Sequence, residues 1–350
     1  MSLDLDTGKH SKPNRIGLAV LALLCLNAAN VVAHPDAQQR DAQAQKPASS
    51  DVDEITRLNH QVVLLVDAGK LDEALLAAKQ ALDTAGKRLG SGHNLVGLAA
   101  HNLAQVYFAK KQYFEAAKFY QRSLNVYEKT LGPNDPKLAD ELDGLGWSSY
   151  GIGEIPKTET CLLRSLSIHE KANGPQSTEA AESLYALGQF YHKSARGNKA
   201  VEFYKRAIPI FEKTRGESDR ELGELLEKCS CALLQNGQKQ EAASMGLRSQ
   251  TILHKRAPGS VLGHVLQGKA VFRAEPVYPY AAKHERISGT VIVEATVDES
   301  GKVITARAVC GPDLLVPASL EAAKNWRFSP TTLNGKPIKA IGTITFNFHL

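Results

Sequence analysis

The sequence predicts a multidomain chain in which an all-α array of helical repeats is followed by a small α+β domain of strand, strand, helix and strand. Gly90, Gly132, Gly174 and Gly216 recur at intervals of 42 residues, and a fixed period of about that length is typical of a helical solenoid. Near the carboxyl end, runs rich in β-branched residues flank turn residues, which indicates a β-hairpin.

Length and composition allow two folded units preceded by a leader. The chain has 350 residues, of which 43% are apolar and 23% are charged, enough for more than one core. Its net charge of +5 arises from 42 basic and 37 acidic residues that are spread along the chain. A nucleic-acid-binding protein usually gathers its basic residues in one stripe, so nucleic acid is not an expected partner.

Residues 1–33 have the pattern of a secretory signal peptide. Three basic residues precede an apolar run, and small residues lead to Ala33, after which we expect cleavage. The alternative is an uncleaved membrane anchor over residues 16–33, because a spanning helix can be as short as about 18 residues. Asn27 and Asn30 lie within that run and argue against a spanning helix.

Residues 34–51 are expected to form a flexible tether. Between residues 36 and 50 there is no large apolar side chain, so this stretch cannot bury enough surface to offset the entropy lost on ordering.

The cysteines are expected to remain thiols. Cys25 lies in the leader. Cys229 and Cys231 are two apart on an expected helix and point to different faces, so they cannot pair with each other. Export would allow oxidation, but we expect buried free thiols at Cys161, Cys229, Cys231 and Cys310.

Residues 52–257 are expected to form five helix pairs. Each unit splits into two amphipathic helices, such as Val96 to Lys110 and Phe114 to Thr130, joined by a short polar turn. Small residues recur in one column, where two helices must approach closely. They are Ala74, Ala116, Thr158, Ala200 and Ala242.

These columns resemble the tetratricopeptide repeat, in the long-helix variant seen in kinesin light chain. One unit carries Leu103-Ala104 with Tyr107, Ala116, Tyr120 and Ser123, and another carries Leu187-Gly188 with Tyr191, Ala200, Tyr204 and Ala207. The resemblance implies a solenoid with atypical end units, whose first helices line a peptide-binding concave surface. Carried over position by position, that surface consists of His101, Gln105, Phe108, Asp140, Asp143, Trp147, Tyr150, Glu182, Tyr185, Gln189, His192, Glu224 and Glu227.

This set is acidic and aromatic, which suits a basic or aromatic-bearing partner segment. The alternative is that its acidic residues form only a solvated helix face. Trp147 argues for binding, because Gln105, Gln189 and Cys231 occupy the same column and the column is therefore not one of apolar packing.

Residues 260–350 are expected to form the α+β domain. Gly289 to Thr296 and Lys302 to Val309 predict two strands, joined by a turn at Asp298 to Gly301. Leu314 to Phe328 predicts a helix with one apolar face. Ala340 to Leu350 predicts a third strand. On its apolar face we expect Gly342, Ile344, Phe346, Phe348 and Leu350.

Several spaced motifs in this region resemble the TonB C-terminal domain. They are Tyr278-Pro279, Gly289-x-Val291, Asp298-x-x-Gly301, Trp326-Arg327-Phe328-x-Pro330 and Asn334-Gly335-x-Pro337. The resemblance implies a periplasmic domain of Gram-negative bacteria that captures an extended segment of an outer-membrane transporter on an exposed strand edge. The implied contacts are the main chain of Thr343, Ile344, Thr345, Phe346, Asn347 and Phe348, and the side chains of Tyr278 and Arg327.

No pattern predicts an enzyme. The 11 histidines show no metal-ligand spacing, and there is no nucleophile elbow, metalloprotease helix or phosphate-binding glycine loop. Gly151 to Pro156 is interpreted as a turn between repeat helices. We therefore expect no catalytic residues, no cofactor and no metal, and protein or peptide segments of the cell envelope as partners.

Two principal hypotheses for function follow, with an uncharacterised enzyme as a third, weaker alternative. A TonB-type transducer keeps an inner-membrane helix and a proline-rich spacer, whereas this leader ends like a cleavage site and the spacer is a repeat array. The first hypothesis is a transducer-like protein, anchored by residues 16–33, that takes part in energy-coupled transmembrane transport. The second is a soluble periplasmic adaptor with two peptide-binding modules and no energy coupling.

Overall fold

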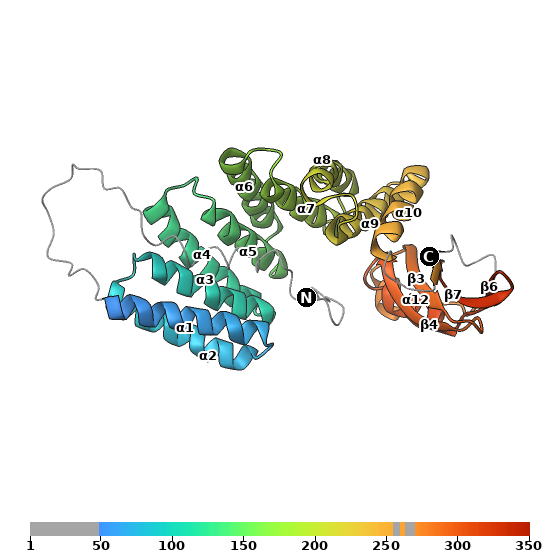
Figure 1. Ribbon diagram of the computed structural model, residues 1–350, viewed down its shortest axis with the longest axis horizontal. Coiled ribbons are helices and arrows are strands. Elements are labelled where there is room, and N and C mark those ends of the chain that lie inside the picture. The colour runs from blue at the N-terminus through green and yellow to red at the C-terminus, as the bar shows by residue number, and fades with distance from the viewer. Residues whose placement is uncertain (1–48, 255–259, 263–269) are drawn as a thin grey trace, which may run out of the picture. The chain divides into compact units, whose positions relative to one another are not determined.

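The computed structural model describes residues 49–254, 260–262 and 270–350 (Figure 1). The predicted signal peptide or anchor lies outside the described residues, as does the tether up to residue 48, and both stay predictions. Among the helices of the described residues, none combines the length and the apolar character needed to span a membrane.

Ten α-helices follow one another in residues 49–254 and form five pairs, which confirms the predicted helical repeat array. The pairs are α1 (Ser49–Asp67) with α2 (Leu71–Leu89), α3 (Asn94–Ala109) with α4 (Tyr113–Leu131), α5 (Lys137–Gly151) with α6 (Ile155–Asn173), α7 (Thr178–Lys193) with α8 (Gly197–Arg215), and α9 (Arg220–Gln235) with α10 (Lys239–His254). The turn predicted between Gly151 and Pro156 separates α5 from α6.

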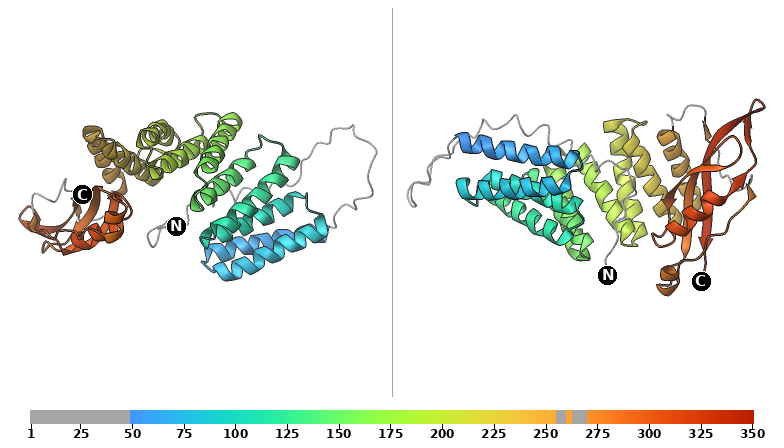
Figure 2. Two further views of the ribbon diagram at one scale, coloured as in Figure 1. Left: turned by 180° about the vertical axis from the view of Figure 1, so that it is seen from behind. Right: turned by 90° about the horizontal axis from the view of Figure 1, so that it is seen from below.

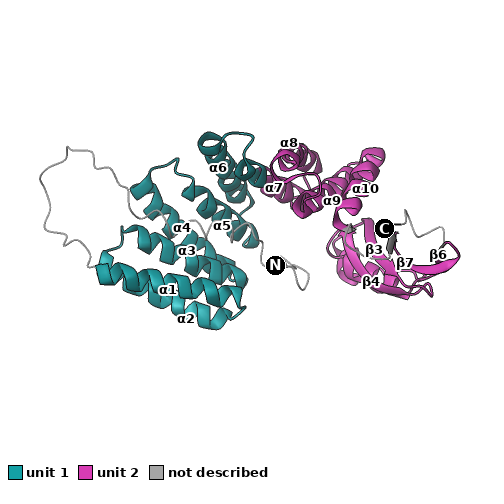
Figure 3. Cartoon of the chain, viewed as in Figure 1, with its two compact units in different colours: residues 1–183 teal, residues 184–350 magenta. Residues whose placement is uncertain are grey.

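The chain divides into two compact units, residues 1–183 and 184–350 (Figure 3). Helix α7 begins in the first unit and ends in the second. The predicted domain limits at 52–257 and 260–350 stay predictions.

The recurring glycines terminate the second helix of each pair. Gly90, Gly132, Gly174 and Gly216 follow α2, α4, α6 and α8, with φ angles of 79°, 92°, 90° and 92°. Their ψ angles of 155°, 165°, 154° and 157° lie outside the αL region, in a positive-φ conformation that glycine adopts without a Cβ clash. The 42-residue period therefore marks the end of each helix pair.

Small residues allow the paired helices to approach closely. Ala74, Ala116, Thr158 and Ala200 are fully buried. On the first helices, a Cβ added to Gly144 would lie 2.4 Å from the Tyr120 ring, and one added to Gly188 would lie 2.4 Å from the Tyr204 ring. Tight packing between helices thus explains why these columns keep small side chains.

The second unit also contains the small sheet. Its elements are β1 (Ser260–Leu262), β2 (Ala270–Phe272), α11 (Tyr280–His284), β3 (Gly289–Val297), β4 (Val303–Cys310), α12 (Val316–Asn325), β5 (Arg327–Phe328), β6 (Thr331–Leu333) and β7 (Lys336–Phe348). The main sheet has the order β1-β7-β3-β4, with β6 paired to the start of β7. Figure 2 shows the ribbon of this sheet from two further sides. Strands β2 and β5 form a separate antiparallel pair.

The predicted strand, strand, helix and strand are present as β3, β4, α12 and β7. The short elements β1, β2, β5, β6 and α11 were not predicted, because runs of two to five residues carry too little periodicity. Strand β7 begins at Lys336 instead of Ala340, since Asn334 and Gly335 alone make the turn, with φ angles of 51° and 77°. Leu350 is 67% exposed, so its predicted place on the apolar face is wrong: it lies beyond the end of the strand.

One face of the sheet forms the core with α12. Ile344, Phe346 and Phe348 of β7 are buried together with Trp326. Trp326 is 4% exposed, and its Nε1 donates a hydrogen bond of 2.8 Å to the carbonyl of Ala274. The aromatic side chain that follows α12 is therefore part of the core.

Candidate partner-binding surfaces

The outer edge of β7 is the first candidate surface. On its inner side β7 pairs antiparallel with β3 from Ala340 to Phe348. On the side away from β3 it pairs with β1 from Lys339 to Ile341, and its first residues, up to Ile338, pair with β6. From Gly342 to Phe348, β3 is its only strand partner within the described residues. Each second residue of such an edge strand directs its main-chain N–H and C=O away from the sheet.

Strand β1 already uses the same edge. Its residues Ser260 to Leu262 pair in parallel with Lys339 to Ile341. The edge is thus able to accept an extended segment in the direction of β7, and the stretch predicted for partner binding, Thr343 to Phe348, follows directly.

The two side chains predicted to assist this edge have neighbours within the domain. The Tyr278 hydroxyl donates a hydrogen bond of 2.7 Å to the Ile287 carbonyl, and its ring packs edge-on against Phe348 at 5.4 Å between centroids. Arg327 is exposed, and its Nη1 donates to the carbonyl of Trp326 at 2.8 Å. Tyr278 thus lies beside the end of β7, whereas the guanidinium of Arg327 is held at the end of α12.

On the face of the sheet away from the α12 core, β3 and β4 contact α9 of the same unit through side chains. Arg307 of β4 donates two hydrogen bonds to Glu227 of α9, at 3.0 and 2.7 Å. Its Nε also donates to Glu294 of β3 at 2.8 Å. Glu294 is 7% exposed, and one guanidinium thus balances two largely buried carboxylates. Burial lowers the pKa of Arg307, but the two glutamates outweigh it and raise that pKa overall.

A disulfide bond joins the same two elements. Cys231 of α9 is bonded to Cys310 of β4, with 5.3 Å between their Cα atoms. The expectation that all the cysteines remain free thiols is therefore wrong for this pair, although it holds for the buried Cys161 and Cys229. Sequence spacing did not predict this disulfide bond, because the two cysteines meet only through the contact of α9 with β4.

In the first unit, His101 of the predicted groove on α3 contacts a carboxylate of α5. His101 Nδ1 of α3 lies 2.7 Å from Glu141 Oε1 of α5. Burial lowers the pKa of His101, but Glu141 and Asp140 outweigh it and raise that pKa overall. Sequence reasoning missed Glu141, which the helical period places just beside the predicted face.

Burial disfavours the charged form of two carboxyl groups on α5. Burial raises the pKa of Asp140 to about 6, and the nearby His101 opposes that shift. Burial also raises the pKa of Asp143 to about 7, with a hydrogen bond from Ser165 opposing the shift and Asp140 and Glu182 adding to it. Asp143 Oδ1 has no hydrogen-bond partner within the described residues. Such a surface favours a ligand that supplies positive charge.

Aromatic residues continue this face. Trp147 is half-buried and packs edge-on against the buried Tyr150, with 5.9 Å between ring centroids. Gln105 and Phe108 of α3 are also half-buried, and Phe108 packs against Tyr113. The acidic residues of α5 therefore do not form a fully solvated helix face.

The predicted groove residues of the second unit are less open. Glu227 is paired with Arg307. Burial lowers the pKa of His192 to about 4, and the Nε2 atom of His192 lies 3.5 Å from Cys231 Sγ. Tyr185 packs beside Tyr204. Glu224, also paired to Arg220, keeps a side chain that is 45% exposed. Of this set, Glu224 is the acidic group most accessible to a partner.

Two families match parts of the chain. Residues 274–350 match the Gram-negative bacterial TonB protein C-terminal family, and residues 95–157 and 150–213 match the tetratricopeptide repeat. Both resemblances suggested by the sequence are thereby confirmed. The protein combines a tetratricopeptide repeat region with a TonB-type C-terminal region.

Among individual proteins, the chain is similar to Protein TonB of Vibrio cholerae serotype O1 (strain ATCC 39315 / El Tor Inaba N16961), with 35% identity over 106 residues. That match covers 30% of this chain and 39% of the relative, so the chain spans well under half of the relative's length. The shared part is too short to transfer the whole relative's activity.

Solved structures resemble the repeat region. A kinesin light chain of Podosopora anserina with nearly identical TPR-like repeats is 21% identical, has a TM-score of 0.53, and is matched over 59% of this chain and 97% of its own. BtubC (BKLC) from P. vanneervenii is 20% identical with a TM-score of 0.51, over 58% and 87% of the two chains. At these identities the likeness establishes the fold alone.

Proposed function

We propose that this protein is a non-enzymatic recognition protein of the cell envelope that captures an extended segment of a partner by strand addition to the outer edge of β7. The observation that carries the proposal is the pairing of β7. Strand β3 covers its inner side along the whole stretch from Ala340 to Phe348, whereas β1 reaches only Ile341 on the outer side.

Strand addition suits this edge for a physical reason. Main-chain hydrogen bonds hold the added strand, and alternating side chains select its sequence. Strand β4 ends the sheet on the other side, and α9 contacts its face through Arg307 and the Cys231–Cys310 bond.

The TonB likeness makes an outer-membrane transporter the first partner to test. In this proposal the chain is exported to the periplasm by residues 1–33, and the repeats form a scaffold whose acidic and aromatic face on α3 and α5 gathers a second, basic segment. Retention of residues 16–33 as an inner-membrane anchor would instead allow participation in energy-coupled transport. A chain cleaved after Ala33 would act as a periplasmic adaptor without energy coupling.

The strand-addition proposal is tested on the full exported chain by backbone amide NMR. Peptides from the N-terminal segments of TonB-dependent transporters are added, and we expect shifts concentrated on Thr343 to Phe348. A matched peptide that is N-methylated at alternate residues keeps the side chains but cannot pair as a strand. Equal binding of both peptides, or shifts that avoid β7, would contradict the mechanism.

Anchorage is tested separately by the intact mass of the chain recovered from cells. A mature chain that begins at His34 supports the adaptor and excludes the anchored transducer. A membrane-bound chain that retains residues 16–33 supports the transducer.

A further inference from the structure

The second helices of the repeats carry a series of arginine–glutamate pairs. In the first unit Arg164 of α6 lies 2.7 Å from Glu128 of α4, and in the second unit Arg248 of α10 lies 2.6 Å from Glu212 of α8. In both pairs the arginine follows the glutamate by 36 residues. In these two pairs a second helix offers a guanidinium to a carboxylate on the preceding second helix, and we call this arrangement the charged ladder.

The ladder follows the sequence period. Its arginine column comprises Arg122, Arg164, Arg206 and Arg248, and its glutamate column comprises Glu128, Glu170 and Glu212. One repeat earlier, the glutamate column falls on Gly86 of α2. Arg122 of α4 is therefore the ladder arginine whose expected carboxylate is missing from the sequence.

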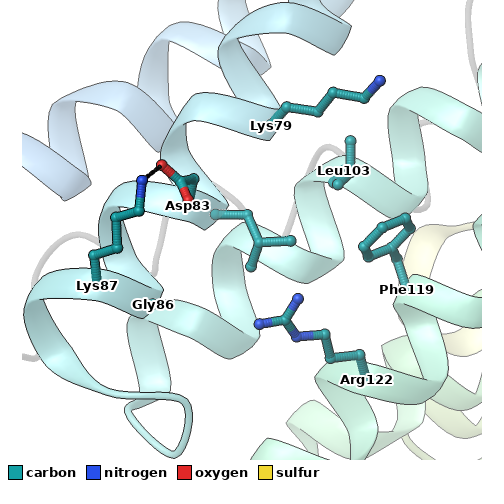
Figure 4. A pocket seen from close by; sticks show the side chains of 8 residues that line it. Lys79, Asp83, Gly86, Lys87, Leu103, Phe119 and Arg122 are labelled. Atoms are coloured by element: carbon teal, nitrogen blue, oxygen red, sulfur yellow. Dashed lines mark hydrogen bonds and ion pairs between the residues drawn. The ribbon is translucent and has the colours of Figure 1, made fainter.

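The structure has a pocket at this position (Figure 4). It measures about 390 Å³, and Gly86 and Arg122 both line it. A Cβ added to Gly86 would meet nothing within 4 Å, so the space that a glutamate side chain would need is open. No ion pair of Arg122 with a described residue is present.

The rest of the lining favours an anion beside an apolar group. Leu82, Leu103 and Phe119 provide apolar surface, and Lys79 and Lys87 add positive charge to that of Arg122. The acidic lining residue, Asp83, is 2.7 Å from Lys87 and partly offsets that lysine. The pocket therefore keeps a net positive charge and an unused planar guanidinium, the group best shaped to bind a carboxylate.

We propose that this pocket binds an acidic side chain of a partner protein, an aspartate or glutamate next to a large apolar residue, which supplies the carboxylate missing at Gly86. The partner's carboxylate pairs with Arg122, and the adjacent apolar side chain covers Leu82, Leu103 and Phe119. This surface has the opposite charge to the acidic face on α3 and α5, and it does not depend on strand addition at β7.

The ladder geometry is tested first by supplying the missing carboxylate within the chain. Gly86→Glu and Gly86→Gln make the same change of helix propensity and nearly the same change of size, so their difference reports the charge. We expect Gly86→Glu to melt about 1–3 °C above Gly86→Gln at low salt. The difference should vanish in an Arg122→Gln background. Equal melting temperatures of the two variants would show that residue 86 does not face Arg122.

Binding is tested on the full chain with two peptides, acetyl-Ala-Glu-Phe-Ala-amide and its Gln counterpart, followed by ligand-observed NMR. We expect the Glu peptide to bind the wild-type chain about fivefold more tightly than the Gln peptide. Arg122→Gln and Gly86→Glu should each remove that preference, because the first deletes the guanidinium and the second occupies it.

Three outcomes would overturn the proposal. They are no binding of the Glu peptide to the wild-type chain, an unchanged preference in Arg122→Gln, and displacement of the peptide by an equal concentration of inorganic phosphate. The last result would assign the pocket to phosphate groups instead of carboxylates. Because Arg122 is exposed and forms no ion pair with a described residue, its replacement leaves the fold intact, which an unchanged melting temperature verifies.

Discussion

At the scale of single residues, burial decides the charge of the carboxyl groups on α5. Asp140 and Asp143 lie on one face of the helix, and the pKa of each is raised by loss of water, to about 6 and about 7. In the second unit, the buried carboxylates of Glu227 and Glu294 are instead compensated by the guanidinium of Arg307. No such cation accompanies Asp143, whose carboxylate therefore costs stability at neutral pH.

The pH dependence follows from the sign of that shift. Because the folded-state pKa of Asp143 is raised from 3.8 to about 7, the folded chain binds the proton more tightly than the unfolded chain. The stabilising contribution is fully present below about pH 3.8 and is lost as the pH rises through 7. We predict that Asp143→Asn increases the free energy of unfolding by about 2 kcal/mol at pH 8, a value discounted for partial exposure.

The same substitution should change little near pH 4, where the wild-type group is protonated in the folded state. Chemical denaturation at pH 4, 6 and 8 measures the trend, and Asp67→Asn on the exposed end of α1 serves as the control. A stability difference that stays constant across this range would contradict the raised pKa.

At the scale of elements, the turn between β3 and β4 depends on one glycine. Gly301 has a φ of 91°, and a Cβ at this position would lie 1.8 Å from the Phe328 carbonyl oxygen. Phe328 is held beside the turn, since its N–H donates a hydrogen bond of 2.8 Å to the Gly301 carbonyl. The hairpin turn and strand β5 thus meet backbone to backbone, and a side chain cannot fit between them.

We predict that Gly301→Ala lowers the free energy of unfolding by about 3 kcal/mol or more, because the substitution combines backbone strain with a direct clash. Gly335→Asn is the matched control: Gly335 also has a positive φ, of 77°, but its Cβ would meet nothing within 4 Å. The control should cost about 1 kcal/mol or less, since asparagine tolerates this conformation. Equal losses in urea titrations of the two variants would mean that the contact with Phe328 is unimportant.

At the scale of the molecule, the second compact unit joins a helical repeat to the sheet by a covalent bond. The Cys231–Cys310 disulfide closes a separation of 79 residues, and the Arg307–Glu227 contact lies beside it. The last helix pair and the C-terminal sheet should therefore unfold together as long as the disulfide is intact.

We predict that Cys310→Ser lowers the stability of this unit by about 4 kcal/mol, the loop-closure estimate for a bond of this span. In calorimetry the oxidised chain should melt the α9 helix pair and the sheet in one transition, and the variant should separate them. Alkylation of the unfolded, unreduced chain provides the direct check. Among Cys161, Cys229, Cys231 and Cys310, only the first two should react, and modification of all four would disprove the disulfide.

Several features of this protein can be derived from its sequence because they depend on neighbours along the chain. The glycine period predicted the helix pairs, and the turn at Asp298 to Gly301 predicted the hairpin of β3 and β4. Alternation placed Ile344, Phe346 and Phe348 on the buried face. In each case the structure is predicted by the residue's own backbone preference, or by apolar residues that recur every 3.6 positions in a helix and every 2 positions in a strand.

Other features were decided only by tertiary structure. The contact of Glu227 with Arg307, the bond of Cys231 to Cys310 and the pairing of β1 with β7 each join residues about 80 apart. The register that relates Arg122 to Gly86 is likewise set by packing between helices, as in the contact of Arg164 with Glu128. Such pairings depend on which faces meet after the chain has folded, and the local patterns that define helices and strands carry no record of them.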